Sequence, residues 1–414
     1  MRAVAVIDGE HYAPVVRDAL RELPYDFAAA YLAGGSEKLR GEADYGVPVV
    51  DDLDTALAEY EPTIVVDLSD EPVLGPRERF RLASRVLARG LPYVGPDFTL
   101  EPPPLEPFPL PSLAVIGTGK RMGKTAVAGY VARLLAEERQ VIVVSMGRGG
   151  PPEPELAELR PTVAGLLELS RDGGHAASDY LETAALSGVV TIGCRRCGGG
   201  LAGATAASNV AAGAQMALTH LPDLVIFDGS GAAIPPIAAG ARVLVAGAHQ
   251  QPEVVAGYLN AYRILISDLV ILTMAEEGSR HQALADAIGA VKPDLAVVAC
   301  VLRPRPVESV RGRRVAFFTT APEDAHDVLG EHLRSEHGAD LVGVSGNLAR
   351  RDALREDIDR LDAEVYLVEI KAAAIDVVAE EASRRGVDVV FADNDVEPLP
   401  GQLDLDEELR TLVA

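Results

Sequence analysis

The chain has 414 residues, 48% of them hydrophobic, and carries a formal net charge of −24 at pH 7. This length predicts two or three domains, because a single hydrophobic core stops growing well below such a size. The large negative charge repels polyanions and argues against DNA or RNA as a general partner.

Membrane and secreted classes are not expected either. The sequence holds no run of about 18 apolar residues, which argues against a membrane-spanning helix. The first two residues lead directly into an apolar run, without the features of a signal peptide. Three cysteines are too few for a disulfide framework and suit a reducing compartment. We therefore expect a cytoplasmic protein with no membrane partner.

The N-terminal part of the chain alternates strand-like and helix-like segments. The strand-like runs lie at 3–7, 27–32, 63–68 and 93–94. The helix-like segments lie at 14–22, 51–59 and 76–89. This alternation predicts an open α/β domain with a mainly parallel sheet. The stretch EPPPLEPFPLP at 101–111 suits a stiff linker, so the first domain is placed at residues 1–105.

A glycine-rich stretch, GTGKRMGKT, runs from Gly117 to Thr125 after the apolar run 113–116. Apolar residues at helical spacing follow it at 126–138. A turn between strand and helix points backbone N–H groups at one spot, where the positive end of the helix favours an anion. In such a loop Lys124 reaches the β and γ phosphates of a nucleotide and the Thr125 hydroxyl holds Mg²⁺. The predicted nucleotide-binding residues are Gly117, Gly119, Lys120, Gly123, Lys124 and Thr125.

The residues after the linker predict a doubly wound, mainly parallel P-loop NTPase sheet over 106–307. Strands as apolar as these are buried on both faces. They lie at 113–116, 141–145, 189–193, 224–227, 243–246, 269–273 and 296–301. Four further strand-like runs follow, at 315–318, 341–344, 365–370 and 389–391. Residues 308–414 therefore form an α/β C-terminal extension or subdomain, and the sequence leaves open whether it is a separate domain.

Two of the strand ends carry candidate metal and phosphate groups. Asp228 follows the buried run 224–227, where its carboxylate can orient Mg²⁺ or the water around it; a plain Asp-Gly turn is the alternative. The loop GRGGPPEPE follows the strand at 141–145 and emerges at the carboxyl edge of the sheet, where ligands of α/β folds bind. In that loop Arg148 can face a phosphate, and Glu153 or Glu155 can face the metal or an activating water. An exposed loop without a role is the alternative.

Cationic residues after two other strands are candidates for a second anion site. Arg195 and Arg196 lie beside the glycines that include Gly199, an arrangement that can bind a phosphorylated group. A solvated surface pair is the alternative. The neighbouring CxxC spacing has no second pair and no clustered histidine, so neither zinc nor redox chemistry is expected. Lys371 begins an apolar helix, where the helix dipole disfavours a cation unless an anion lies nearby.

The motifs together resemble those of a known family. The phosphate loop has Thr118 where the common pattern has glycine, and it resembles the variant GTxxxxGKT of dethiobiotin synthetase and its relatives. The whole set resembles cyclic 2,3-diphosphoglycerate synthetase, known chiefly from methanogenic archaea. The motifs that carry this resemblance are DGEHY, GTGKRMGKT, GRGGPPEPE, CRRCGGGLAG, DGSGAAIPP, SGNLARR and EIKAAAIDVV. They extend over nearly the whole chain.

The resemblance implies an ATP-dependent ligase. It would use Mg²⁺ to close the two phosphates of 2,3-bisphosphoglycerate into an intramolecular pyrophosphate, giving cyclic 2,3-diphosphoglycerate, ADP and phosphate. The residues that would neutralise the substrate are Lys120, Arg148, Arg195, Arg196 and Lys371. The predicted catalytic residues are Lys120, Lys124, Arg148 and Asp228, and the predicted metal ligands are Thr125, Asp228 and Glu155. The resemblance also suggests K⁺ as a cofactor and a homodimer.

Two other functions remain open on the sequence alone. The first is a kinase of 2-phosphoglycerate or a similar small phosphorylated acid. The second is a nucleotide-driven switch ATPase or metallochaperone, which would normally carry metal ligands rich in histidine or cysteine. Relatives with the variant loop often place an acid after the second strand, where this chain has Ser145, Met146 and Gly147. Glu155 is the candidate substitute.

Overall fold

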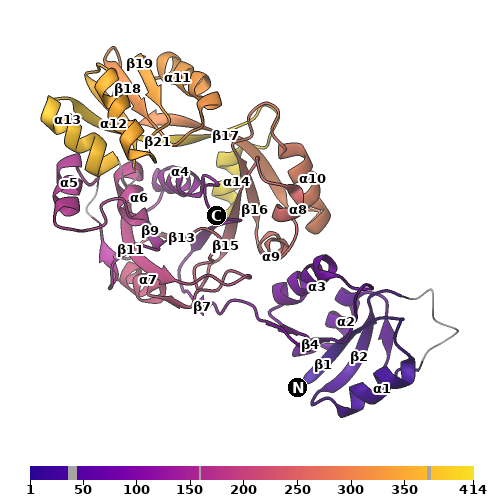
Figure 1. The fold of residues 1–414 in the computed structure, drawn as a ribbon. Coiled ribbons are helices and arrows are strands. Elements are labelled where there is room, and N and C mark those ends of the chain that lie inside the picture. The colour runs from indigo at the N-terminus through magenta and orange to yellow at the C-terminus, as the bar shows by residue number, and fades with distance from the viewer. Residues whose placement is uncertain (36–43, 158–159, 371–373) are drawn as a thin grey trace.

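The computed structural model describes residues 1–35, 44–157, 160–370 and 374–414. Its mixed α/β architecture with largely parallel sheets confirms the predicted fold class. Figure 1 shows the N-terminal part set apart from the rest of the chain and joined to it by an extended segment. None of the helices in the described ranges combines the length and apolarity needed to cross a bilayer.

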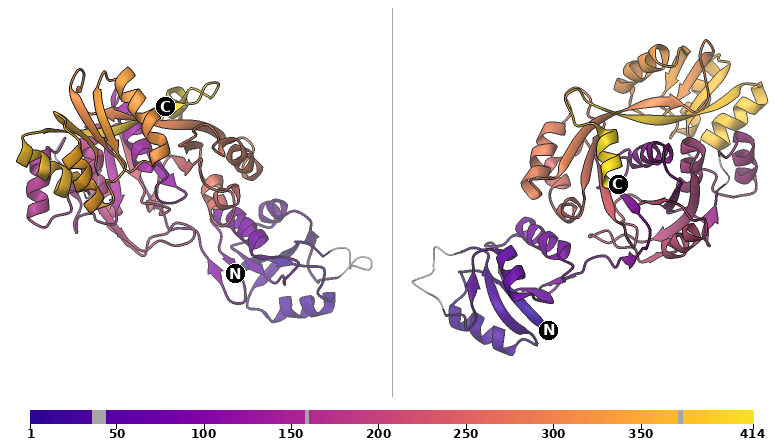
Figure 2. Two further views of the ribbon diagram at one scale, coloured as in Figure 1. Left: turned by 45° about the horizontal axis from the view of Figure 1, so that its top comes forward. Right: turned by 180° about the vertical axis from the view of Figure 1, so that it is seen from behind.

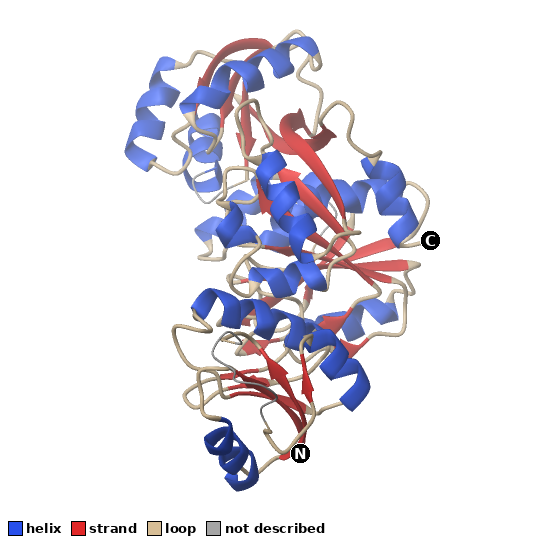
Figure 3. Ribbon diagram, turned by 90° about the vertical axis from the view of Figure 1, so that its right-hand side faces the viewer, coloured by secondary structure: helices blue, strands red, loops and turns tan. Residues whose placement is uncertain are grey.

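The N-terminal part is one twisted sheet with helices on both faces (Figure 3). Its strands have the order β3-β2-β1-β4-β5-β6, and only β5 and β6 pair in antiparallel fashion. The strands are β1 (Arg2–Ile7), β2 (Asp26–Leu32), β3 (Val49–Val50), β4 (Ile64–Asp67), β5 (Tyr93–Val94) and β6 (Thr99–Leu100). The helices are α1 (Ala13–Glu22), α2 (Leu53–Tyr60) and α3 (Pro76–Ala88).

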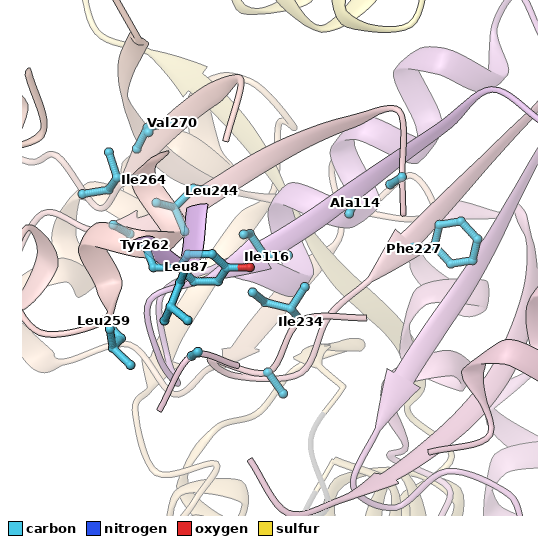
Figure 4. Close-up of a cluster of buried hydrophobic side chains, with 14 of the residues drawn as sticks. Leu87, Ala114, Ile116, Phe227, Ile234, Leu244, Leu259, Tyr262, Ile264 and Val270 are labelled. Carbon is cyan, nitrogen blue, oxygen red and sulfur yellow. The ribbon is translucent and has the colours of Figure 1, made fainter. Parts of the chain in front are cut away.

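The proline-rich linker contributes a single short strand, β7 (Glu106–Pro107), which pairs with β14 (Ile237–Ala238). The N-terminal part also contacts the centre of the molecule directly. Leu87 of α3 lies beside Leu259 and Tyr262 in one buried apolar cluster (Figure 4). Ser84 donates a hydrogen bond of 3.2 Å to the carbonyl oxygen of Tyr258. The buried apolar contacts therefore hold the N-terminal part against the centre of the molecule, in addition to the covalent linker.

The central sheet has the strand order β10-β11-β9-β13-β8-β15-β16-β17, with the phosphate-loop strand β8 in its interior. The strands are β8 (Ser112–Gly117), β9 (Val141–Gly147), β10 (Glu155–Leu156), β11 (Val190–Cys197), β12 (Ala207–Ser208), β13 (Leu224–Asp228), β15 (Ala241–Gly247), β16 (Leu269–Thr273) and β17 (Ala296–Pro306). Most are buried on both faces, because helices cover each side (Figures 2 and 3). These helices are α4 (Lys124–Ala136), α6 (Asp179–Ser187), α7 (Val210–Thr219), α8 (Pro252–Val255), α9 (Asn260–Leu265), α10 (His281–Val291) and α14 (Leu405–Leu412). Helix α5 (Val163–Arg171) packs instead against the π-helix at Ala374–Ala379 in the C-terminal part.

The C-terminal strands continue the hydrogen bonding of the central sheet. The first half of β17 pairs with β16, and residues Cys300–Pro306 pair with β21 in antiparallel fashion. The order then runs β17-β21-β20-β18-β19. The strands are β18 (Arg314–Phe318), β19 (Asp340–Ser345), β20 (Val365–Glu369) and β21 (Asp388–Pro398). The helices are α11 (His326–Ser335), α12 (Arg351–Arg360), a π-helix (Ala374–Ala379) and α13 (Glu380–Arg385).

A buried ion cluster fastens the C-terminal strands to the helix of the phosphate loop. Asp393 of β21 is buried and pairs with Arg133 of α4 and, at 3.0 Å, with Arg305 of β17. Burial raises the pKa of the Asp393 carboxyl, and the two guanidinium groups oppose that shift. Because α4 follows the phosphate loop directly, this cluster fixes the far end of the nucleotide-binding helix.

Candidate nucleotide and anion site

The glycine-rich loop joins the end of β8 to the start of α4, as the sequence predicts. Gly123 caps the helix with φ +71°, a conformation that residues with a Cβ rarely adopt. Thr118 fixes the other side of the loop: its backbone N–H donates to Val245 O at 3.1 Å, and its hydroxyl donates to Gln250 Oε1 at 2.7 Å. The threonine in place of the usual glycine therefore ties the loop to the residues that follow β15.

Lys124 and Asp228 form an ion pair at the bottom of this loop. Lys124 is the first residue of α4 and Asp228 the last residue of β13, so the two neighbouring elements bring them together. Lys124 Nζ contacts Asp228 Oδ1, while Oδ2 is buried and has no hydrogen-bond partner among the described residues. Burial raises the pKa of Asp228 to about 6, although the ammonium group opposes the shift. The lysine that should bind phosphates thus rests on a buried carboxylate.

The buried oxygen of Asp228 is the feature that tests whether Mg²⁺ fits. Within the described ranges no group of three or more His, Cys, Asp or Glu residues is placed to hold a metal ion. Mg²⁺ commonly takes only one or two protein carboxylates and completes its shell with phosphate oxygens and water. Asp228 Oδ2 and the half-buried Thr125 meet that requirement beside a nucleotide. Glu155 lies on β10, exposed, and accepts a hydrogen bond of 3.2 Å from Tyr180; its role as a ligand stays a prediction.

Two cationic side chains, Lys120 and Arg196, approach Gly231 in the turn after β13. A Cβ built on Gly231 would lie 3.7 Å from Lys120 Cγ and 3.8 Å from Arg196 Nη2. Arg196 donates to Ser230 O at 2.9 Å and to the Gly198 carbonyl at 2.6 Å. Burial lowers the pKa of Arg196, and the nearby positive charge of Arg148 lowers it further. Positive charges this close together repel each other and favour a bound anion.

The structure separates the two arginines that the sequence placed together. The strand predicted at 189–193 runs on to Cys197, so Arg195 and Arg196 lie on β11 rather than in a loop after it. Successive side chains of a strand leave opposite faces, and Arg195 is exposed to solvent. Gly199 lies near Arg196, because a Cβ there would be 3.4 Å from Arg196 Nη1. Lys371 falls outside the described residues.

The same alternation separates the two cysteines of the CxxC motif. Both lie on β11, three positions apart, and therefore on opposite faces. Cys194 is buried, which raises its pKa to about 12, whereas Cys197 is exposed.

Sequence reasoning missed Asp179, the first residue of α6. Its carboxylate lies at the end of β9, with Oδ2 3.1 Å from a Cβ built on Gly147. It is close enough to influence the pKa of both Asp228 and Arg196. No signal in the sequence points to this residue, because it follows no strand and belongs to no glycine-rich motif. Only the packing of α6 against β9 and β11 brings it to the site.

A buried arginine holds the turn after β13 in place. Arg263 of α9 is 2% exposed and donates to the carbonyl oxygen of Ala232 through Nε and Nη2, at 3.1 and 2.6 Å. It also donates to the carbonyl oxygens of Leu201 and Leu259. The neighbouring Gly231, with φ +59°, approaches the phosphate loop so closely that a Cβ on Gly117 would lie 3.0 Å from its carbonyl oxygen.

Replacing Arg263 by methionine is expected to destabilise the protein by about 3 kcal/mol. The substitution keeps much of the side-chain volume but leaves several buried carbonyl groups without donors, each worth about 1–3 kcal/mol. A thermal unfolding scan measures the effect. The control is Arg280→Met, since Arg280 makes one exposed hydrogen bond to His249 O and should change stability by less than about 1 kcal/mol. Equal unfolding curves for wild type and Arg263→Met would contradict this role.

A glycine-rich loop between an interior parallel strand and a helix, with a lysine set against a strand-end aspartate, defines a P-loop nucleotide-binding protein. Residues 112–301 match the P-loop domain of cyclic 2,3-diphosphoglycerate synthetase, and residues 2–101 and 306–395 match its N-terminal and C-terminal domains. The chain therefore belongs to the cyclic 2,3-diphosphoglycerate synthetase family.

Individual relatives agree with this assignment. The chain is 54% identical to the cyclic 2,3-diphosphoglycerate synthetase of Rubrobacter xylanophilus, over 97% of this chain and 96% of that protein. It is 40% identical to the enzyme of the same name from Methanothermobacter thermautotrophicus, over 94% and 91% of the two chains. Among solved structures, LpxK from Aquifex aeolicus in complex with ATP is 14% identical and covers 75% of this chain and 91% of its own, with a TM-score of 0.42.

Proposed function

We propose that the protein is an ATP-dependent ligase that joins the two phosphates of 2,3-bisphosphoglycerate, giving cyclic 2,3-diphosphoglycerate, ADP and inorganic phosphate. The observation that carries this proposal is the meeting of two sites at Gly231. On one side of it lies the phosphate loop with Lys124, and on the other lie the cations Lys120 and Arg196. Family membership supplies the identity of the substrate.

Charge explains why these cations are needed. A substrate with two phosphates and a carboxylate brings about five negative charges next to about four on ATP. Like charges a few ångströms apart repel by several kcal/mol at a protein-like dielectric constant. The positive charge of Arg148 disfavours the charged form of Arg196, and an anion bound beside them would relieve that repulsion. Arg195, Gly199 and Lys371 are further candidates for the same substrate site.

The groups of the chain suggest a route by charge stabilisation and positioning. A substrate phosphate oxygen attacks the γ-phosphorus of ATP, and ADP leaves. The second substrate phosphate then attacks the phosphorus so activated, forming the ring anhydride and expelling inorganic phosphate. Lys124 holds the β and γ phosphates, and the N–H groups of the loop bind their oxygens. Thr125 and Asp228 would hold Mg²⁺, which supplies positive charge to the transferring phosphoryl group.

Product analysis tests the function. Incubation with ATP, Mg²⁺ and 2,3-bisphosphoglycerate should give a product that has lost one water from the acid by mass spectrometry. Phosphorus NMR should show an anhydride rather than a new monoester. A phosphorylated acid as the product would instead identify a kinase, and ATP hydrolysis that ignores the acid would identify a switch ATPase. Oxygen-18 placed in the substrate phosphates should appear in the released phosphate, and its absence there would exclude the proposed route.

The proposal includes two further properties, a requirement for K⁺ and a homodimeric assembly. Both come from the family resemblance. Assays with K⁺ replaced by a larger organic cation test the first, and light scattering tests the second.

Arg196→Gln is expected to raise the KM for bisphosphoglycerate by about 10- to 100-fold, because a hydrogen bond to a charged group contributes about 1.5–3 kcal/mol. Binding of ATP alone should change little, since Arg196 donates its hydrogen bonds to Gly198 and Ser230 rather than to the phosphate loop. Steady-state kinetics with each substrate varied give both quantities. The control is Arg171→Gln on the exposed surface of α5. An equal KM increase from Arg195→Gln would place both arginines on the substrate; an unchanged KM for Arg196→Gln would remove Arg196 from the site.

A further inference from the structure

Two buried polar oxygens without a hydrogen-bond partner among the described residues lie at the carboxyl ends of β9 and β13. They are Ser145 Oγ and Asp228 Oδ2, on residues that are 0% and 1% exposed. Ser145 and Asp228 lie opposite each other in the parallel register of the two strands, so their side chains share one face of the sheet. That face is covered by α4 and α6, which lie side by side on it (Figure 1). Buried polar atoms are normally paired, so a bound group is expected beside these two oxygens.

Asp179 brings a second carboxylate to the same face of the sheet. It is the first residue of α6, and its carboxylate has no hydrogen-bond or ion-pair partner among the residues that the structure describes. Gly147 is the neighbour that lets it approach, since a Cβ there would lie only 3.1 Å from Asp179 Oδ2. Gly147 follows Ser145 by two residues and therefore lies on the same face of β9, and Ser145 pairs with Asp228, so the Asp179 carboxylate lies on the face of the sheet that carries Asp228.

The arrangement of charges requires a cation once a nucleotide binds. In the described structure Lys124 neutralises Asp228 from one side. When the ammonium group turns to the phosphates of ATP, Asp228 loses its countercharge while Asp179 lies nearby on the same face of the sheet, and neighbouring carboxylates repel. A divalent cation relieves that repulsion and gives Asp228 Oδ2 a partner.

We propose that Asp179 and Asp228 together form the carboxylate part of a divalent metal site, with Asp179 supplied by the start of α6. Because Gly147 has no side chain, the Asp179 carboxylate can approach the end of β9. The inference rests on the proposed use of Mg²⁺·ATP and names a ligand that the sequence motifs did not contain. Glu155, the ligand predicted from sequence, lies on the exposed edge strand β10 and is engaged by Tyr180.

Metal binding can be measured without turnover. The full-length protein is loaded with a non-hydrolysable ATP analogue and titrated with Mn²⁺, whose free form is followed by electron paramagnetic resonance. Asp179→Asn is expected to weaken Mn²⁺ binding about 10- to 100-fold, the range found when groups that hold or orient a metal are lost. Binding of the analogue in the presence of a chelator should be equal to or tighter than in wild type, because a negative charge near the phosphates has been removed.

Two variants complete the design. Asp172→Asn removes an exposed carboxylate just beyond α5 and should leave Mn²⁺ affinity unchanged. Gly147→Ala keeps every charge but displaces the Asp179 carboxylate, so it should weaken Mn²⁺ binding as well. Thermal unfolding of each variant shows whether it is folded. If Asp179→Asn is poorly folded, the comparison of Gly147→Ala with wild type decides the question.

Wild-type Mn²⁺ affinity in folded Asp179→Asn or Gly147→Ala would overturn the proposal. Weakening by Glu155→Gln together with wild-type affinity in Asp179→Asn would transfer the role to Glu155 and overturn it too. Failure of the proposed function gives a different result. The wild-type protein would bind the metal–nucleotide complex and Asp179→Asn would not, yet the wild-type protein would make no cyclic product.

Discussion

Lys124→Ala is expected to reduce the rate of cyclisation about 10³-fold and to destabilise the nucleotide-free protein as well. The catalytic loss follows from removing a positive charge aimed at the transferring phosphoryl group. The loss of stability follows from the ion pair, because Asp228 is 1% exposed and would be left without its countercharge. Removing one partner of a buried pair costs about 3 kcal/mol or more. Single-turnover kinetics and thermal unfolding measure the two effects.

The double variant Lys124→Ala with Asp228→Asn separates these causes. It should recover much of the lost stability, because no buried charge remains, and it should recover none of the activity. Wild-type stability in Lys124→Ala would show that the two side chains do not depend on each other. Wild-type affinity for ATP in that variant would remove the phosphate loop from the proposed function.

Gly119→Val is expected to weaken ATP binding at least about 10-fold while leaving the stability of the protein almost unchanged. Among the described residues, a Cβ at Gly119 meets no atom within 4 Å beyond its two chain neighbours, and the backbone there is not in the left-handed region. The added methyl groups would therefore fill only the space in which the loop's N–H groups face a phosphate. Calorimetric titration with Mg²⁺·ATP measures the affinity.

The matched control for this prediction is Gly289→Val on α10. A Cβ at Gly289 also meets nothing within 4 Å, but it lies far along the chain from the phosphate loop. Both variants should unfold within about 0.5 kcal/mol of wild type, as exposed substitutions usually do. Full ATP affinity in Gly119→Val would mean that the triphosphate binds elsewhere.

The fold could be predicted largely from local signals. Apolar runs predict the buried strands, because a parallel strand that is covered on both faces must be apolar at nearly every position. The glycine-rich turn placed the start of α4 within two residues, since it must carry the phosphate-binding N–H groups. The full length of β17 could not be predicted, because Pro304 and Pro306 lack the N–H group that a strand ladder uses and so argue against a strand beyond residue 301. Antiparallel pairing with β21 carries the strand on to Pro306.

The site could be predicted only where its residues follow strands. Their positions after strands predict Lys124 and Asp228 as site residues. Their direct ion pair depends on how α4 and β13 are placed relative to each other, which the sequence does not show. Arg195 and Arg196 look alike in sequence, and their separation depends on how far β11 extends. Asp179 reaches the site through the packing of a helix, for which the sequence offers no periodicity or motif.

The strand β17 also limits how this polypeptide can be divided. Its backbone is bonded to β16 along one half and to β21 along the other, and β21 belongs to the last part of the chain. A polypeptide that ends at Pro306 would expose the unpaired backbone N–H and C=O groups of β17 from Cys300 onward. Exposed strand edges of this kind pair with other chains and cause aggregation. Dividing the chain after β17 should therefore give insoluble protein unless β17 and β21 are kept in the same fragment.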